Sequence, residues 1–205
     1  MNKPLIAIDI DDVISETTEA IRVWSNTASG VELSSHQFNQ TAGEYWGYYE
    51  RVWNNHGISL NFNDFETSMA EDMIEVPLLA DASFALHEIL ESYNVVLITS
   101  RITALRGHTE RWFEKHFPGN NISLHFASNP KSGENRLTKG QICKQLGASL
   151  LIDDNPEHCA SMLQEGLEAI LFGDYGWQQA VPEGAVRCKR WPDVLEYLNG
   201  RQQLS

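Results

Sequence analysis

Five carboxylates follow directly on two short apolar runs of the sequence. They are Asp9, Asp11 and Asp12 after residues 5–8, and Asp153 and Asp154 after residues 150–152. If the two runs are neighbouring strands of one sheet, at least four of these carboxylates converge on one crevice. Like charges that close cannot all stay ionised without a compensating cation. Because carboxylate oxygens prefer hard ions, the pattern predicts a divalent cation site, with Mg²⁺ as the most suitable ion.

Each acidic pair also has a simpler interpretation. An aspartate just after a strand often caps the next helix, because its side chain accepts a hydrogen bond from a free N–H group of the first turn. One pair alone would fit that interpretation. Two pairs, together with Thr99 after a third apolar run and Lys139 further on, favour a catalytic site.

The apolar runs have the length and composition of strands that are buried on both faces, as is typical of a parallel sheet. The predicted strands cover residues 5–8, 95–98, 150–152 and 169–172, with 124–127 as a weaker candidate. Helices are predicted between them at residues 82–92, 106–117, 138–146 and 156–166. This alternation predicts an α/β fold, a Rossmann-like parallel sheet with helices on both faces. Ligands of such a sheet bind at the carboxyl ends of its strands, where the carboxylates lie.

Residues 15–80 do not follow this alternation. The segment is mostly helical in pattern and holds nine aromatic residues, so we interpret it as a helical insertion after the first strand. The predicted domains are therefore a core of residues 1–14 and 81–205 and an inserted unit of residues 15–80. Most of the aromatic side chains are expected inside the insertion, although Tyr45, Trp46, Tyr48 and Tyr49 are too dense for all to be buried on one helix face.

Composition excludes several classes of function. The chain has 205 residues, 42% hydrophobic and 21% charged, as in an ordinary soluble globular domain. Its formal net charge of −13 would repel nucleic-acid polymers and anionic membranes, so neither is an expected partner. Three cysteines without CxxC spacing indicate a reducing compartment rather than a disulfide framework. The first apolar run is too short for a signal sequence or a membrane span, and a cytoplasmic protein is expected.

Four short motifs resemble those of the haloacid dehalogenase-like (HAD) phosphohydrolases, in the order found in that superfamily. They are Asp9-Ile10-Asp11-Asp12-Val13, Thr99, Lys139 and Ile152-Asp153-Asp154. The inserted segment resembles the helical C1-type cap of some members. The combination of motifs is most similar to the 5'(3')-deoxyribonucleotidase-like branch and its bacterial relatives, although Asp12 stands where those enzymes commonly have glycine. The resemblance covers most of the chain outside the insertion.

The resemblance implies a role for each matching residue. Asp9 would be the nucleophile that forms an aspartyl-phosphate, and Asp11 would protonate the leaving group and later deprotonate the attacking water. Thr99, helped by Ser100, would bind the phosphoryl group, whose charge Lys139 and Mg²⁺ would neutralise. The metal ligands would be Asp9, Asp11 through its backbone carbonyl and Asp154, with Asp153 as a further ligand or as an orienting residue.

Several assignments keep an alternative. Lys131 competes with Lys139 for the lysine role, which we give to Lys139 because it begins a helix shortly before the acidic strand end. Arg101 and Arg106 follow Thr99 and would either bind the substrate phosphate or lie on a helix surface. Tyr45 and Trp46 of the insertion are the candidate platform for the leaving group.

The predicted function is Mg²⁺-dependent hydrolysis of a small phosphomonoester. A nucleoside monophosphate is favoured by the resemblance alone, and a sugar phosphate or another metabolite is the alternative within the same class. A receiver-type signalling module also gathers acidic residues, a threonine and a lysine around Mg²⁺. Its residues would come in another order, however, because here Thr99 and Lys139 both precede the second acidic pair.

Overall fold

The computed structural model describes residues 3–68, 72–127 and 137–202. Its centre is a six-stranded parallel sheet with the order β3-β2-β1-β4-β5-β6. The strands are β1 (Leu5–Ile8), β2 (Asn94–Thr99), β3 (Ser123–Phe126), β4 (Ala148–Asp153), β5 (Glu168–Phe172) and β6 (Val186–Cys188). The predicted α/β parallel sheet is confirmed. Strand β1 lies at its centre, between the two strands that carry Thr99 and Asp153.

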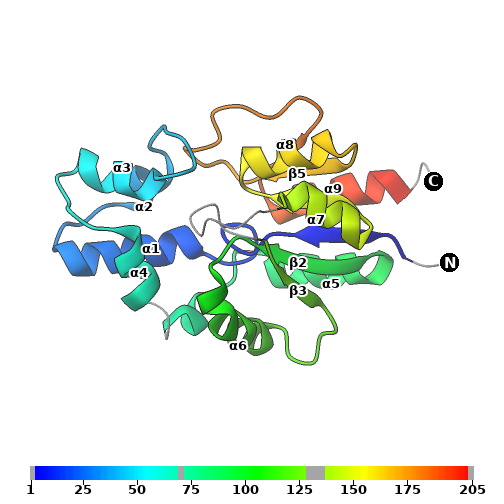
Figure 1. Ribbon diagram of the computed structural model, residues 1–205, viewed down its shortest axis with the longest axis horizontal. Coiled ribbons are helices and arrows are strands. Elements are labelled where there is room, and N and C mark those ends of the chain that lie inside the picture. Colours follow the sequence, from blue (N-terminus) through cyan, green and yellow to red (C-terminus); the bar gives the residue numbers. More distant parts are fainter. Residues whose placement is uncertain (1–2, 69–71, 128–136, 203–205) are drawn as a thin grey trace.

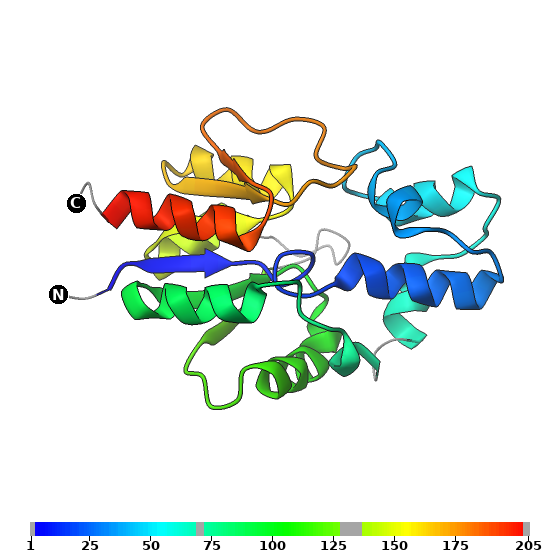
Figure 2. The same ribbon diagram turned by 180° about the vertical axis from the view of Figure 1, so that it is seen from behind.

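Helices cover both faces of the sheet, as Figures 1 and 2 show from opposite sides. They are α5 (Ala82–Ser92), α6 (Arg106–His116), α7 (Lys139–Leu146), α8 (Pro156–Gln164) and α9 (Trp191–Gln202). Successive strand residues point to opposite faces, so Ile6 and Ile8 join the core formed with α5, α6 and α9. Ala7 joins the other core, with α7 and α8. Burial on both faces explains why the central strands are uninterrupted apolar runs.

Strand β6 and helix α9 were not predicted from the sequence, whereas the predicted strand 169–172 corresponds to β5. Strand β6 has only three residues, Val-Arg-Cys, and exists through its pairing with β5. Helix α9 buries Trp191, Val194 and Leu198 against the sheet. A three-residue edge strand is too short to show a periodic hydrophobic pattern. Whether such a segment forms a strand depends on the neighbouring strand with which it pairs.

The inserted segment folds into helices that lie beyond the carboxyl ends of the strands (Figure 1). They are α1 (Thr17–Ser29), α2 (Ser35–Asn39), α3 (Tyr48–Asn55), α4 (Phe62–Ser68) and the 3₁₀ helix η1 (Asp72–Glu75), while a second 3₁₀ helix, η2 (Thr103–Leu105), precedes α6. Helices α1 to α4 share an apolar core of their own, with Phe38, Tyr48 and Trp53 buried in it. Met73 of η1 instead joins the core of the sheet, and η1 packs against α6. Of the helices described, none has both the length and the apolarity to cross a membrane.

The insertion leaves and rejoins the rest of the chain through adjacent segments. The Glu16 N–H group donates to the Pro77 carbonyl at 2.9 Å, and the Leu79 N–H group donates to the Ile14 carbonyl at 2.8 Å. The entry turn contains Asp12, which has a left-handed backbone with φ of 56°. Its carboxylate accepts hydrogen bonds from the Thr18 N–H group at 2.8 Å and from the Thr18 hydroxyl at 2.6 Å. Asp12 therefore caps α1, as the simpler interpretation of the acidic pairs expects.

Candidate active site

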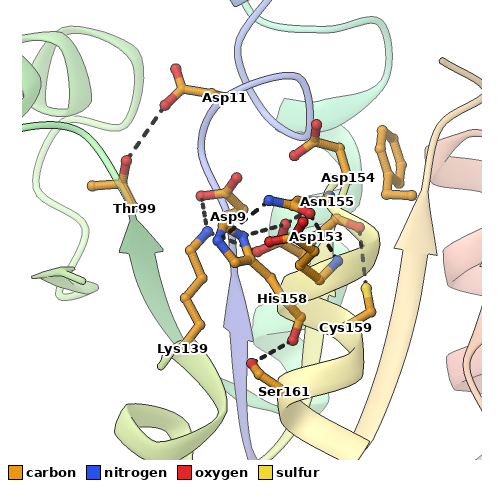
Figure 3. Close-up of polar contacts among 12 residues, drawn as sticks. Asp9, Asp11, Thr99, Lys139, Asp153, Asp154, Asn155, His158, Cys159 and Ser161 are labelled. Carbon is orange, nitrogen blue, oxygen red and sulfur yellow. Dashed lines mark hydrogen bonds and ion pairs between the residues drawn. The ribbon is translucent and has the colours of Figure 1, made fainter. Parts of the chain in front are cut away.

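Three carboxylates meet at the carboxyl ends of β1 and β4 (Figure 3). The pairing places Ile8 beside Ile152, and the Asp9 N–H group donates to the Ile152 carbonyl at 2.9 Å. This register brings Asp9 level with Asp153 and Asp154. One carboxylate oxygen from each of the three lies within 4.8 Å of the others, and all three side chains are buried.

Lys139 supplies the positive charge of this group, and we call Asp9, Asp153, Asp154 and Lys139 the strand-end cluster. The Lys139 Nζ lies 2.7 Å from Asp9 Oδ1 and 2.8 Å from Asp153 Oδ2. The lysine is the first residue of α7, which begins at a capping box formed by Thr138 and Gln141.

Gly140 lets α7 approach α8 closely enough to place that lysine. A Cβ atom at position 140 would lie 2.1 Å from the Ser161 carbonyl oxygen, so no larger residue fits without movement of one helix. The Gly140 N–H group also donates to the Ser161 hydroxyl at 3.0 Å. The helix contact therefore determines where Lys139 stands.

The charges of the strand-end cluster do not balance within the protein. Burial raises the pKa of Asp9 to about 8, with Lys139 opposing the shift and Asp153 adding to it. Burial, together with Asp153 and Asp9, raises the pKa of Asp154 well above its usual range. Burial would also raise the pKa of Asp153, but Lys139 and His158 hold it well below its ordinary value. When all three carboxylates are ionised, the single ammonium group leaves two negative charges, which a divalent cation neutralises.

The donor set fits such a cation. Asp154 Oδ2 accepts a hydrogen bond from the Trp177 indole N–H at 3.0 Å, whereas Asp154 Oδ1 is buried and has no hydrogen-bond partner among the described residues. A buried carboxylate oxygen without a donor is costly unless a cation binds it. Asp9, Asp153 and Asp154 therefore have the oxygen chemistry and the charge that Mg²⁺ requires.

Residues without a predicted site role hold Asp153 in place. Its Oδ1 accepts hydrogen bonds from the Asn155 N–H group at 2.9 Å and from His158 Nδ1 at 3.1 Å. Burial lowers the pKa of His158, so the imidazole donates to Asp153 as a neutral ring. Asn155 also caps α8 by accepting from the Glu157 N–H group at 2.9 Å. The sequence offered no signal for His158, because its role depends on the turn between β4 and α8.

The Asp11 carboxylate lies outside the strand-end cluster, although the sequence placed it among the converging acids. Arg101 holds it with Nη2 2.6 Å from Oδ1, and the Thr17 hydroxyl donates to the same oxygen at 2.6 Å. Figure 3 shows Asp11 directed away from Asp9, with Thr99 Oγ1 3.5 Å from Asp11 Oδ2. Burial alone would raise the pKa of Asp11, but Arg101 and Thr17 lower it below its ordinary value. The carboxylate turns outward because a buried guanidinium pairs with it there.

The other predicted phosphate-binding residues gather at the end of β2. Thr99 is fully buried, and its hydroxyl accepts a hydrogen bond from the Arg101 N–H group at 3.1 Å. The Arg101 guanidinium also contacts the Thr109 hydroxyl at 3.2 Å, so its position is fixed by Asp11 and Thr109 together. Arg106 lies over the Phe126 ring, 4.1 Å from its centroid, on the side of α6. Lys131, the alternative to Lys139, lies outside the described residues.

A cavity of about 180 Å³ separates the inserted helices from the strand ends. From the core, Asp11, Ser100 and Arg101 line it. From the insertion come the aromatic residues Tyr45, Trp46, Tyr48, Tyr49, Phe62 and Phe65, and we call the space the aromatic cavity. Trp46 also ties the insertion to the core, since its indole N–H donates to Glu157 Oε2 at 2.9 Å. The candidate residues Tyr45 and Trp46 thus face the same space as Ser100 and Arg101.

The aromatic cavity is acidic. The carboxylates of its wall belong to Asp11, Asp12, Glu50 and Glu66. Among the described residues that line it, Arg101 is the sole arginine or lysine, and Arg101 is paired with Asp11. Among the described residues that line the cavity, acidic residues therefore outnumber basic ones.

No family model matches the chain, and no relative is found among curated proteins. Solved structures do match over nearly the whole chain. A haloacid dehalogenase-like protein of unknown function from Agrobacterium tumefaciens has 16% identity and a TM-score of 0.65, covering 98% of this chain and 100% of its own. The chain has the haloacid dehalogenase-like fold. At this level of identity the likeness establishes the fold and leaves the activity to be argued from the site.

Two further structures share this HAD-like fold. A HAD hydrolase from Bacillus subtilis bound to magnesium has 11% identity and a TM-score of 0.63, covering 97% of this chain and 100% of its own. A protein described as a predicted phosphoglycolate phosphatase from Haemophilus somnus has 10% identity and a TM-score of 0.61, covering 96% of this chain and 98% of its own. None of the three is described as a nucleotidase, so the likeness supports the HAD-like fold and does not single out that branch.

Proposed function

We propose that the protein is a Mg²⁺-dependent phosphomonoester hydrolase. The observation that carries the proposal is the strand-end cluster, in which three buried carboxylates face a single ammonium group at the edge of a parallel sheet. On an unrelated fold this arrangement would indicate only a cation site. On a HAD-like fold, with Thr99 at the adjacent strand end, it has the parts needed to transfer a phosphoryl group to a carboxylate.

Asp9 is the proposed nucleophile. One of its carboxylate oxygens attacks phosphorus, the bond to the ester oxygen breaks, and an aspartyl-phosphate forms on Asp9. The Thr99 hydroxyl donates a hydrogen bond to a phosphoryl oxygen, and Lys139 compensates the charge of the carboxylates as the phosphate arrives. Asp9, Asp153 and Asp154 would hold Mg²⁺, which when bound neutralises negative charge on the phosphoryl group.

Asp11 is the proposed proton carrier. It would protonate the departing ester oxygen, then take a proton from the water that hydrolyses the aspartyl-phosphate, which releases inorganic phosphate and restores Asp9. Its pairing with Arg101 keeps the carboxylate ionised in the present arrangement, which is the form that accepts a proton. To protonate the leaving oxygen, Asp11 would therefore turn away from Arg101 and first take up a proton from solvent water; the proton that it later removes from the attacking water restores this acid form.

We propose nucleoside monophosphates as the substrate, with residues 15–80 acting as the cap that selects them. The aromatic cavity offers rings on which a base can stack, and it adjoins Asp11. Its carboxylates oppose a leaving group that carries a second anion, such as the carboxylate of phosphoglycolate. Phosphoglycolate and sugar phosphates are the competing substrates, the first because a structurally similar protein is described as a predicted phosphoglycolate phosphatase.

A panel of phosphorylated metabolites tests both the proposed hydrolase activity and the proposed preference for nucleoside monophosphates. Released phosphate is measured for nucleoside monophosphates, sugar phosphates, phosphoglycolate and a small aryl phosphate, each with and without Mg²⁺. Repeated turnover that depends on Mg²⁺ supports the hydrolase, whereas at most one phosphate released per chain would indicate a receiver-like phosphoacceptor. Preference for phosphoglycolate over every nucleotide would contradict the proposed substrate class and leave the hydrolase in place.

A further inference from the structure

The loop that follows β5 is bound to the inserted helices along its backbone. The Gly176 N–H group donates to the Asn39 carbonyl at 2.7 Å, and the Gly43 N–H group donates to the Gly176 carbonyl at 3.3 Å. A Cβ atom at position 176 would lie 2.1 Å from the Thr41 carbonyl oxygen, so this approach requires glycine. The loop thus follows a core strand in the sequence, but its backbone contacts are with the inserted segment.

Trp177 of this loop is buried among cap aromatics. Its ring stacks on Tyr175 at a centroid distance of 4.4 Å and an angle of 6°. It meets Tyr48 of α3 edge to face at 4.8 Å, and Tyr45 at 6.0 Å. Only 3% of Trp177 is exposed, so the ring has little freedom to turn independently of α3.

The polar edge of the same ring contacts the strand-end cluster. The Trp177 indole N–H lies 3.0 Å from Asp154 Oδ2 and 3.3 Å from the Asp154 carbonyl oxygen. This contact occupies one carboxylate oxygen and leaves Oδ1 as a buried oxygen that has no partner in the part of the chain that the structure describes. Trp177 therefore fixes which oxygen of Asp154 remains available to a cation.

We infer that Trp177 is a positioning residue that links cap packing to divalent-cation affinity. The Trp177 N–H group orients the Asp154 carboxylate. Because the Trp177 ring packs against Tyr48 of α3, a shift of α3 would move the ring and, with it, that carboxylate. The inference rests on the proposed function, since it concerns the Mg²⁺ that Asp9, Asp153 and Asp154 would hold. Groups that orient metal ligands are typically worth roughly 10- to 100-fold in metal affinity or activity.

Calorimetric titration of the full-length protein with MgCl₂ tests the inference without reference to turnover. Trp177→Phe keeps a ring and removes the N–H donor, and we expect the Mg²⁺ affinity to fall by roughly 10- to 100-fold. Trp191→Phe is the matched control, because Trp191 is equally buried and its indole N–H donates to the Val13 carbonyl at 3.0 Å, outside the strand-end cluster. Equal Mg²⁺ affinity in the two variants, with both folded by circular dichroism, overturns the inference.

A pair of variants at Tyr48 tests the link to the cap and replaces Trp177→Phe if that variant fails to fold. Tyr48→Leu removes the ring that Trp177 contacts. Tyr48→Phe keeps the ring and loses the hydrogen bonds of the hydroxyl group to the backbone of Phe38 and Thr41. We expect weaker Mg²⁺ binding by Tyr48→Leu than by Tyr48→Phe, and equal binding overturns the link. Absence of Mg²⁺ binding by the unmodified protein would instead contradict the proposed function, and the inference with it.

Discussion

The strand-end cluster and the aromatic cavity adjoin each other but differ in construction. In the cluster, no residue is more than 3% exposed, and β1, β4 and the start of α7 determine the position of each side chain. In the cavity wall, Trp46 is 37% exposed, and the side chains come from short helices and the loops between them. The core thus carries fixed charges, and the insertion carries a partly open apolar surface.

The contrast assigns different tasks to the two regions. Preorganised charges in a buried site act on a transition state without reorganising, so the strand-end cluster is suited to chemistry common to all phosphomonoesters. An aromatic wall with carboxylates discriminates by shape, stacking and charge, so the aromatic cavity is suited to selecting the leaving group. Changes in the cluster should therefore affect every substrate alike, whereas changes in the cavity should affect substrates unequally.

Asp9→Asn should have the largest effect. Loss of the nucleophile at nearly unchanged volume is expected to lower kcat by roughly 10³-fold or more for every phosphomonoester. Phosphate release from an aryl phosphate and from a nucleotide measures the loss, and a thermal unfolding scan verifies the fold. Residual turnover within tenfold of the parent would remove Asp9 from the mechanism.

Removal of Mg²⁺ should abolish turnover and also lower stability. Chelation leaves the carboxylates of the strand-end cluster without their cation. At a Mg²⁺ concentration of 100 times Kd, the bound ion would contribute about 2.7 kcal/mol to the free energy of unfolding. Tm measured with MgCl₂ and with EDTA reports this contribution. In Asp154→Asn, which lacks one charged ligand, the increase in Tm on adding Mg²⁺ should be smaller; an increase equal to that of the parent would contradict the assigned site.

Gly140→Ala should impair catalysis through helix packing. The added methyl group would collide with the Ser161 carbonyl and push α7 from α8, which displaces Lys139. A displacement of about 1 Å near reacting groups can cost about 10²-fold in rate, and we expect this for all substrates. Gly107→Ala in α6 is the control, since a methyl group there has 3.9 Å of clearance from Arg111. Equal kcat for the two variants would show that Lys139 does not depend on this contact.

Tyr45→Ala and Trp46→Ala should separate the substrates. Loss of a stacking ring is expected to cost about 1–3 kcal/mol for a nucleotide, seen as a raised KM, and much less for a small aryl phosphate. Phe84→Ala on the outer face of α5, where Phe84 is 61% exposed, should change neither KM. If Tyr45→Ala and Trp46→Ala raise both KM values equally, these rings belong to the cap core and do not contact the leaving group.

Glu50→Gln should have the smallest effect on activity. Unlike the other variants, it should increase kcat/KM for a substrate whose leaving group is anionic. Removing one carboxylate from the wall of the aromatic cavity should raise kcat/KM for phosphoglycolate by up to about fivefold, the range of a partly exposed charge interaction. Glu88→Gln on the exposed side of α5 controls for net charge. The same increase in both variants would indicate a general charge effect and no contact at Glu50.

Local sequence was sufficient to predict the core of the fold. The apolar runs that became β1, β2 and β4 need no partner to be recognised, because burial on both faces imposes an uninterrupted apolar composition. The helix that begins after Thr138 and ends at Gly147 follows from the same kind of local rule, a capping box and a left-handed glycine. Since the candidate residues adjoin these strands and this helix, their clustering followed from the parallel arrangement.

Tertiary structure alone decided which side chains meet within that region. Asp11 is two residues from Asp9, yet it pairs with Arg101, 90 positions along the chain. Trp177 reaches Asp154 from a loop 23 positions away, and no periodicity marks either contact. The sequence by itself determined the elements and the chemical types of residue at their ends, because those depend on neighbours along the chain. The contacts depend on strand order and on how closely α7, α8 and the inserted helices pack, and these are properties of the whole chain.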